Sequence, residues 1–233
     1  MHGRQKHQPV NARDLLNATK PVVPFYSEGT DPASEKVREF IVGVFAMGAV
    51  AVSIVTYFKA TKLPFLTLFP SLFAAFLIAS LWSYHRNMAK IQSATAETLL
   101  GHEQDNVVNA IHKFQSETAV PPHIIIRDQI SKISTSAIQL FMQCEKEGSL
   151  DSRGVLFVLS AKTGGYALVL GQGLARKTLV ITPVLIAMAR FEQRQYAPGL
   201  IDALNAFRPQ LAQVFPRTGA PPRPAADALD IRS

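Results

Sequence analysis

The chain has 233 residues, a net charge of +7 and a hydrophobic share of 48%, enough for one ordinary domain with additional segments. The basic excess is spread along the chain instead of forming one stripe, which argues against a nucleic-acid-binding protein. The single cysteine, Cys144, excludes an internal disulfide and is typical of a reducing compartment.

Residues 1–38 are polar, are interrupted by four prolines and have no sustained hydrophobic period. A segment of this composition buries too little apolar surface to order itself, so we expect an extended N-terminal arm. The proline-rich residues 217–233 are expected to form a second arm, a C-terminal tail. We expect a partner surface to hold both arms, as in a subunit of a larger assembly.

Two long uncharged runs, 40–58 and 64–84, lie close together within residues 39–90. Roughly 20 apolar residues in a helix cross the hydrocarbon core of a bilayer, so these runs predict a transmembrane helical hairpin. Basic residues are more frequent before the first run and after the second than in the short loop between them. The positive-inside rule then places both termini in the cytoplasm, in a multi-pass protein of a bacterial inner membrane.

Small residues recur every four positions along the second run. Small side chains let helices approach closely in lipid, so this small-residue seam is expected to face another helix, either of the hairpin or of a partner subunit. Because neither run contains an ionisable side chain apart from tyrosines near the ends, a transporter, proton pump or ion channel is not expected. The seam residues are Ser71, Ala75, Ala79 and Ser83.

Residues 91–216 have the pattern of a soluble α/β domain. In chain order they predict a helix, a strand, a helix, a hairpin of two strands and two further helices, which is a small α/β sandwich. The whole chain is therefore expected to be α+β, with a transmembrane hairpin followed by this sandwich. The expected elements are 97–118, 123–127, 134–148, 154–160, 166–170, 182–191 and 197–215.

Five short stretches of this region resemble the TPM domain family, which includes thylakoid-lumen proteins associated with photosystem repair and bacterial membrane-anchored proteins. They are Glu117-Thr118, Arg153-Gly154-Val155-Leu156, Gly171-Gln172-Gly173-Leu174, the segment 191–204 (FEQRQYAPGLIDAL) and Phe215-Pro216. The resemblance implies a TPM-like sandwich. Some family members are described as phosphatases or metal binders, so it also implies a possible phosphatase or metal site.

The departures from that family point towards binding. Pro121-Pro122-His123 stands where the family has an acidic, glycine-containing step, and Gln172 stands where it often has an aspartate. The segment 179–189 (LVITPVLIAMA) carries no charge, although it is too short to span a bilayer. A helix that is apolar all round is buried on more than one side, so we expect Leu179, Val180, Val184 and Ile186 to contact a partner or the membrane surface.

The polar candidates do not form a strong catalytic or metal-binding pattern. Asp128, Glu147 and Asp151 are weak candidates for a hard cation such as calcium, but no clustered Asp-x-Asp run supplies the oxygens that calcium needs. Gly171-Gln172-Gly173 is read as a tight turn, although an anion cradle is an alternative. His112, His123, Ser152, Ser160 and Cys144 are expected to be structural or solvated.

The sequence therefore predicts a non-catalytic, membrane-anchored accessory or assembly subunit without a cofactor. Its expected partners are the lipid bilayer and other membrane subunits of a host complex, photosynthetic (reaction centre or antenna) in the first place and respiratory in the second. The host is suggested by the family resemblance alone. The alternative is a membrane-tethered phosphatase or metal-dependent hydrolase of the TPM type that uses Asp128 and Asp151, with calcium binding without catalysis as an intermediate case.

Overall fold

The computed structural model describes two units of the chain. The larger unit comprises Met1–Gly29 and Ala94–Ser233, and the smaller one Thr30–Ser93. In the larger unit the described residues are 20–29, 94–175, 181–219 and 224–233, with the backbone alone at 181–184. In the smaller unit they are ten separate helical residues: 41, 44, 45, 47, 48, 75, 76, 78, 79 and 82.

The larger unit, called the sheet domain below, alternates helices and strands. The strands are β1 (Val22–Ser27), β2 (Pro122–Arg127), β3 (Val155–Ser160), β4 (Tyr166–Leu170) and β5 (Leu229–Arg232). The helices are α4 (Gln104–Glu117), α5 (Ile133–Lys146), α6 (Gln172–Ala175), α7 (Ile181–Glu192) and α8 (Tyr196–Val214), with 3₁₀ turns η1 (Gly101–Glu103) and η2 (Ala225–Ala228).

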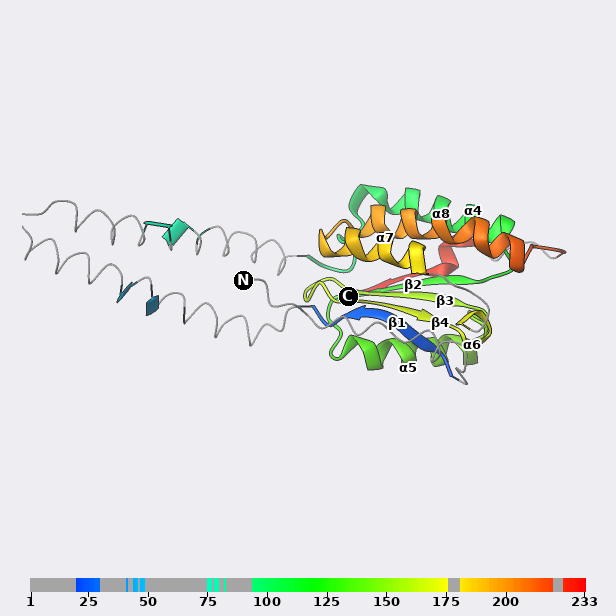
Figure 1. Cartoon of the computed structure of the whole chain (residues 1–233), viewed down its shortest axis with the longest axis horizontal. Helices are drawn as coiled ribbons and strands as arrows, with labels where there is room; N and C mark the ends of the chain where they lie inside the picture. Colours follow the sequence, from blue (N-terminus) through cyan, green and yellow to red (C-terminus); the bar gives the residue numbers. More distant parts are fainter. Residues whose placement is uncertain are drawn as a thin grey trace, which may run out of the picture. The chain divides into compact units, whose positions relative to one another are not determined.

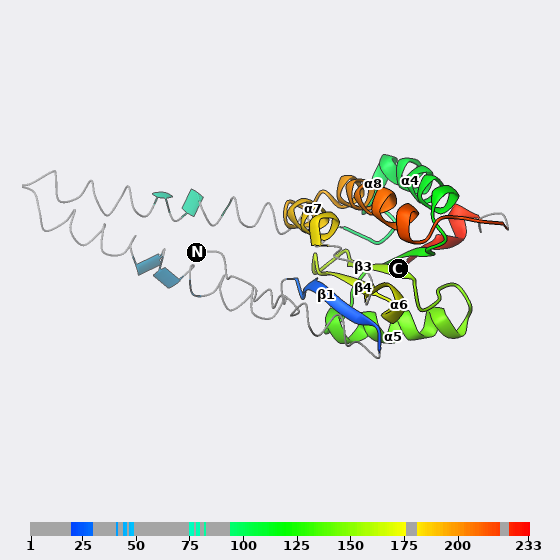
Figure 2. The same cartoon turned by 45° about the vertical axis from the view of Figure 1, so that its right-hand side comes forward.

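The five strands form one mixed sheet in the order β1-β4-β3-β2-β5. β2 is parallel to β3 and β5, whereas β4 is antiparallel to β3 and β1. Helices α4, α7 and α8 cover one face of the sheet and α5 covers the other, which gives three layers (Figures 1 and 2). The mixed α+β class is confirmed, and so is the predicted order of helices and strands between residues 97 and 215, except that the short helix α6 was not predicted.

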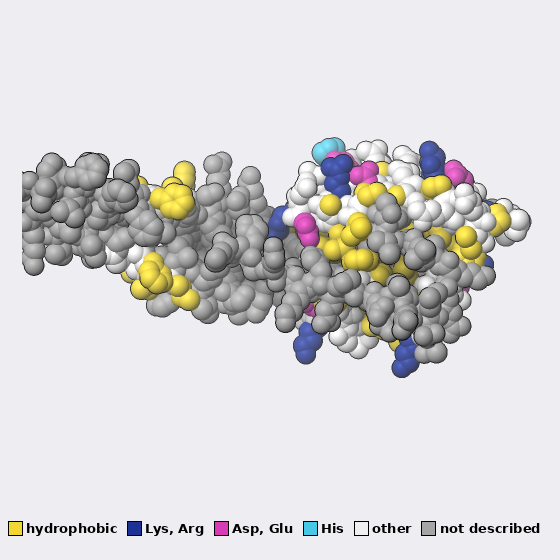
Figure 3. All heavy atoms as spheres, in the orientation of Figure 1, with side chains coloured by type: hydrophobic (Ala, Val, Ile, Leu, Met, Phe, Trp, Pro, Cys, Tyr) yellow, Lys and Arg dark blue, Asp and Glu magenta, His cyan; other side chains and the backbone are white. Residues whose placement is uncertain are grey.

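The predicted membrane hairpin lies almost wholly outside the described residues. Within the part of the chain that the structure describes, no helix is both long and apolar enough to cross a membrane. The ten separate residues of the smaller unit are helical, and their large apolar side chains appear as yellow spheres among undescribed atoms (Figure 3). The hairpin therefore stays a prediction.

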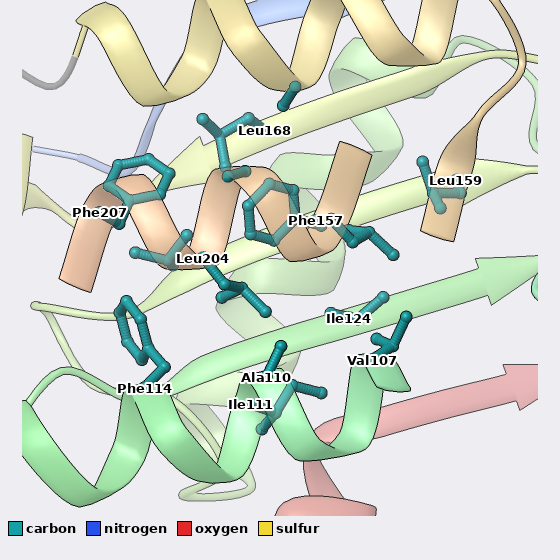
Figure 4. Packing of buried hydrophobic residues seen from close by; sticks show 14 of the residues in the cluster. Val107, Ala110, Ile111, Phe114, Ile124, Phe157, Leu159, Leu168, Leu204 and Phe207 are labelled. Atoms are coloured by element: carbon teal, nitrogen blue, oxygen red, sulfur yellow. The ribbon is translucent and has the colours of Figure 1, made fainter. Parts of the chain in front are cut away.

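The main core lies between the sheet and α4, α7 and α8 (Figure 4). Because side chains alternate across a strand, Ile124 and Ile126 of β2 enter this core while Ile125 enters the smaller core beneath α5. Phe157 and Phe207 meet edge to face in the main core, with ring centroids 6.4 Å apart. Strands β3 and β4 are buried along their whole length because both of their faces are covered.

The two arms were expected to lie outside this domain, and for parts of each this expectation is wrong. Val22–Ser27 of the N-terminal arm forms edge strand β1, which pairs with β4. Leu229–Arg232 of the C-terminal tail forms the opposite edge strand β5, which pairs with β2. These segments gain their order from the backbone hydrogen bonds of the sheet, so the surface that holds them belongs to the chain itself.

Candidate functional site

A groove lies on the α5 side of the sheet, over β2 and β5. Helix α5 packs against β1, β4 and β3, which leaves β2 and β5 less covered on this face. The resulting hollow has a volume of about 460 Å³. It is lined by His123, Ile125 and Arg127 of β2, by Leu140, Gln143, Cys144, Glu147 and Ser149 of α5 and the turn after it, and by Asp227, Leu229, Asp230 and Arg232.

Asp230 is the centre of the charged part of this groove. Its carboxylate lies 2.7 Å from Nη2 of Arg127 and 2.8 Å from Nε of Arg232. Arg127 also donates to the backbone carbonyl of Asp230, which attaches β5 to β2 through a side chain as well as through the strand ladder. Burial disfavours the charged carboxylate, but the hydrogen bond and charge of Arg127, together with Arg232, outweigh it and hold the pKa of Asp230 below its usual range.

The imidazole and the thiol that line the groove belong to buried residues. His123 is 7% exposed and Cys144 is 5% exposed. Burial raises the pKa of the Cys144 thiol, so the thiol stays protonated at neutral pH and is a poor nucleophile. Cys144 therefore has the structural position that was one of the two expected from the sequence.

The groove can hold a polar ligand by charge and hydrogen bonding. Because β2 and β5 are parallel and Arg127 pairs in register with Arg232, both guanidinium groups belong to one end of the strands. Glu147 and Asp227 follow α5 and precede β5, respectively, and so belong to the other end. This arrangement suits a ligand that carries both signs of charge.

No protein-family model matches the chain, and no curated protein matches it. One solved structure that resembles it is the NMR structure of the BA42 protein from the psychrophilic bacterium Bizionia argentinensis. The two share 19% identity at a TM-score of 0.43, over 55% of this chain and 86% of the other. Similarity at this level says nothing of function, and the TPM resemblance stays a prediction.

The three weak metal candidates do not come together. Asp128 follows β2 and Asp151 precedes β3, and because these strands are parallel the two carboxylates lie at opposite ends of the sheet. Asp128 contacts Lys162 at 2.9 Å, Asp151 contacts Arg153 at 2.6 Å, and Glu147 accepts a hydrogen bond from Gln143. Among the described residues no group of three or more His, Cys, Asp or Glu side chains could hold a metal ion.

The glycine turn after β4 serves the packing of the backbone. The Gly171 N–H donates to the carbonyl of Gly154, and the Gly173 N–H donates to the carbonyl of Ser152. A Cβ at Gly171 would lie only 2.3 Å from that Ser152 oxygen. Both amides are thus occupied within the fold, which supports the interpretation of Gly171-Gln172-Gly173 as a tight turn.

The remaining polar candidates have structural or solvated positions. The Ser160 hydroxyl accepts hydrogen bonds from the Ile130 N–H at 3.2 Å and from the Thr163 hydroxyl at 2.7 Å. His112 is exposed on α4, and Ser152 takes part in the glycine turn through its carbonyl.

The predicted partner-binding residues are only partly described. Ser71, Ser83, Leu179 and Val180 lie outside the described residues, as does the side chain of Val184. Ala75 and Ala79 are helical and exposed. On α7, Leu185 is 51% exposed and Ile186 is 36% exposed, whereas Ala187, Met188 and Phe191 enter the main core. This helix is therefore apolar both towards the core and towards its surroundings.

Sequence reasoning missed the groove because four of its twelve lining residues, including Asp230, lie in the C-terminal tail. Asp230 and Arg127 are 103 residues apart, so no motif spacing joins them. One signal was present: His123, Ile125 and Arg127 alternate along a strand, which places all three on one face. Two polar residues on a face that was expected to be buried indicate a lining rather than a core.

Proposed function

We propose that this chain is a non-catalytic, membrane-anchored accessory subunit of a larger membrane protein complex. The observation that carries the proposal is the exposure of large apolar side chains in the smaller unit. Phe45, Met47, Phe76 and Trp82 are between 67% and 71% exposed. Ile41, Val44 and Ile78 are between 47% and 52% exposed.

Large apolar side chains with this exposure are normally shielded from water by another protein or by a membrane. Contiguous apolar surface on a soluble monomer is normally small, and larger patches mark contacts with proteins or membranes. The described positions belong to helical stretches within the two uncharged runs, so lipid is the first candidate for the cover and another membrane helix is the second. A lipid-facing helix with small residues such as Ala75 and Ala79 suits an anchor that also packs against partner helices.

The sheet domain supports a binding role more than a catalytic one. Its groove offers charge and hydrogen bonding, and its one thiol, Cys144, is buried with a raised pKa. The two carboxylates of the hydrolase alternative, Asp128 and Asp151, lie at opposite ends of the sheet. Leu185 and Ile186 add an apolar contact point on α7. The TPM resemblance suggests a photosynthetic host complex first and a respiratory one second.

The test is extraction of the native membrane in mild detergent, followed by size separation and identification of the proteins that co-migrate with this chain. We expect stoichiometric co-migration with a pigment-bearing or respiratory complex. Migration alone, as a small monomer or homo-oligomer, contradicts the subunit proposal. Release of the chain by alkaline carbonate without detergent contradicts the anchor itself.

A pair of substitutions tests whether the small-residue seam forms the contact. Ala75→Leu with Ala79→Leu adds bulk where helices would approach closely, so the chain should leave its host complex and stay in the membrane. Phe76→Leu with Ile78→Leu is the control, because it keeps the apolar character and adds no bulk at the seam. Retention of the alanine variant in normal amounts removes the seam from the contact.

A further inference from the structure

The segment 224–233, drawn in red in Figure 1, buries little apolar surface. It consists of the 3₁₀ turn η2 and the edge strand β5, whose neighbour among the described strands is β2. Its buried side chains are the small ones of Ala225 and Ala228, which are 8% and 2% exposed. Leu229 and Ile231 are only partly buried against the main core. Because small or partly buried side chains remove little apolar area from water, burial contributes little to the order of this segment.

The strand pairing that holds this segment is short. β5 has four residues and is parallel to β2, an orientation that is slightly less stable per residue than the antiparallel one. Arg127 of β2 reinforces the pairing, since it donates to the carboxylate of Asp230 at 2.7 Å and to its carbonyl at 3.3 Å. These contacts must offset the conformational entropy that is lost when the segment is ordered. We therefore expect the segment to open more readily than the strands in the middle of the sheet.

The strand that this segment covers is itself firmly held. Ile124, Ile125 and Ile126 of β2 are at most 2% exposed, and β2 pairs with β3 along its whole length. β2 therefore stays in the sheet when the segment opens. Its outer edge then presents unpaired backbone N–H and C=O groups beside apolar side chains. An extended peptide can add to such an edge as a further strand.

The contacts of β5 define which peptide suits the β2 edge. The chain's own strand places an apolar residue beside Ile124, an acidic one beside Ile125 and an apolar one beside Ile126. The acidic residue is Asp230, which supplies the carboxylate for Arg127. Release takes this carboxylate away, and a strand that brings another to the same position regains a charge-assisted hydrogen bond.

We propose that the segment 224–233 is a releasable strand, and that its release opens the β2 edge to an extended segment of a partner protein with the same apolar–acidic–apolar pattern. The contacts involved all lie within the sheet domain, so this inference does not depend on the membrane anchor. Release also removes four of the twelve residues that line the groove. The chain's own strand thus closes the docking site, and the partner's segment replaces it through the same kinds of contact.

Native-state hydrogen exchange on the full chain in detergent tests the release. Amides that exchange through a local opening depend little on denaturant, because a small opening exposes little surface. We expect the amides of 229–232 to have protection factors at least about tenfold lower than those of 155–160 in β3, and a weaker dependence on denaturant. Equal protection with the same denaturant dependence in both strands overturns the release.

A matched pair of substitutions in η2 tests the docking site. Ala228→Gln places a larger polar side chain in the main core, whereas Ala226→Gln makes the same change at an exposed position. The probe is a fluorescent synthetic peptide with the sequence of residues 224–233, PAADALDIRS. We expect it to bind the Ala228→Gln chain at least about tenfold more tightly than the wild-type or Ala226→Gln chain, because the tethered strand then competes less.

A second peptide tests the acidic position. The same peptide with Asp230→Asn lacks the carboxylate for Arg127, so it should bind the Ala228→Gln chain about tenfold more weakly. Equal affinity of the two peptides overturns the acidic requirement. Absence of peptide binding to an Ala228→Gln chain that still protects β3 overturns the docking site. Unfolding of the whole domain by Ala228→Gln would show that the segment and β3 form one cooperative unit, which overturns the release.

Discussion

Asp128 and Ala96 are 32 residues apart, and the carboxylate of the first accepts a hydrogen bond from the N–H of the second at 2.7 Å. This contact is made where the chain re-enters the sheet domain. The same carboxylate contacts Lys162, so one side chain joins the returning segment, the end of β2 and the β3–β4 turn.

The contact at Asp128 predicts a dependence of stability on pH. The hydrogen bond from Ala96, assisted by Lys162, lowers the pKa of Asp128. A lowered pKa in the folded state means that the stabilisation is present above the unfolded value, near 3.9, and is lost as the pH falls through the folded value. We therefore expect Asp128→Asn to reduce the free energy of unfolding at pH 7 and to lose this effect in strong acid. Denaturant titrations at several pH values measure both, and equal losses at pH 7 and in strong acid contradict the prediction.

Glu28, which follows β1, forms hydrogen bonds with the start of α5. Its carboxylate occupies two groups at the start of α5, where unpaired N–H groups otherwise need a side-chain acceptor. We expect Glu28→Ala to cost about 1 kcal/mol and to speed hydrogen exchange at Ile133 and Ser134. Glu28→Gln retains one acceptor oxygen and serves as the control, with a smaller cost. Unchanged exchange in the alanine variant rules out this cap.

The close packing around Gly171 leaves no space for a side chain at this position. A Cβ there would lie 2.3 Å from the Ser152 carbonyl oxygen, which is backbone and cannot move aside cheaply. We expect Gly171→Ala to cost about 2 kcal/mol or more. At Gly148 there is open space, and only its φ of 72° opposes a side chain, so Gly148→Ala should cost about 1 kcal/mol. Thermal unfolding of the two variants compares these costs, and equal losses argue against the close approach.

The sequence predicts the inner part of the fold well and its edges poorly. Each central strand contains an uninterrupted apolar run and the helices have clear periodicity, so most predicted bounds lie within a few residues of the observed ones. The exception is the helix expected at 97–118, which begins only at Gln104, after turns and the 3₁₀ turn η1. The edge strands carry weaker signals. β1 contains Pro24 and its register shifts between Val22 and Phe25, while β5 has four residues of which two, Asp230 and Arg232, are charged. Short and charged edge strands protect a sheet from aggregation. The same features weaken the alternating apolar pattern by which a strand is recognised in a sequence.

The candidate site was less predictable than the fold for a related reason. Its charges come from the middle of the domain and from the far C-terminal segment, and they meet only because β5 lies beside β2. The carboxylates that the sequence did indicate, Asp128 and Asp151, are separated by the parallel register of β2 and β3. Sequence spacing alone carries neither piece of information.

The separation of Asp128 and Asp151 has a consequence for catalysis. If the chain were a hydrolase using both, it would turn over a phosphoester in a metal-dependent way, and Asp151→Asn would abolish that activity. We expect the full chain to hydrolyse p-nitrophenyl phosphate at the background rate with magnesium or calcium, and Asp151→Asn to be indistinguishable from it. Metal-dependent turnover that the substitution removes would restore the hydrolase alternative.

Asp230 predicts that a side-chain pair helps to hold β5 on the sheet. Its contact with Arg127 has both side chains only 22–23% exposed, so solvent screens it less than a surface pair. We expect Asp230→Asn to cost about 1 to 2 kcal/mol, because Arg127 then keeps a charge without its anionic partner. Since the pKa of Asp230 is lowered, this stabilisation should be present above about pH 4 and be lost below it. Arg232 is 73% exposed, so Arg232→Gln should change stability little and provides the control. Hydrogen exchange of the backbone amides along 229–232 is the direct measurement. We expect faster exchange in Asp230→Asn and unchanged exchange in Arg232→Gln. Equal exchange rates in the two variants would mean that the backbone ladder alone attaches β5.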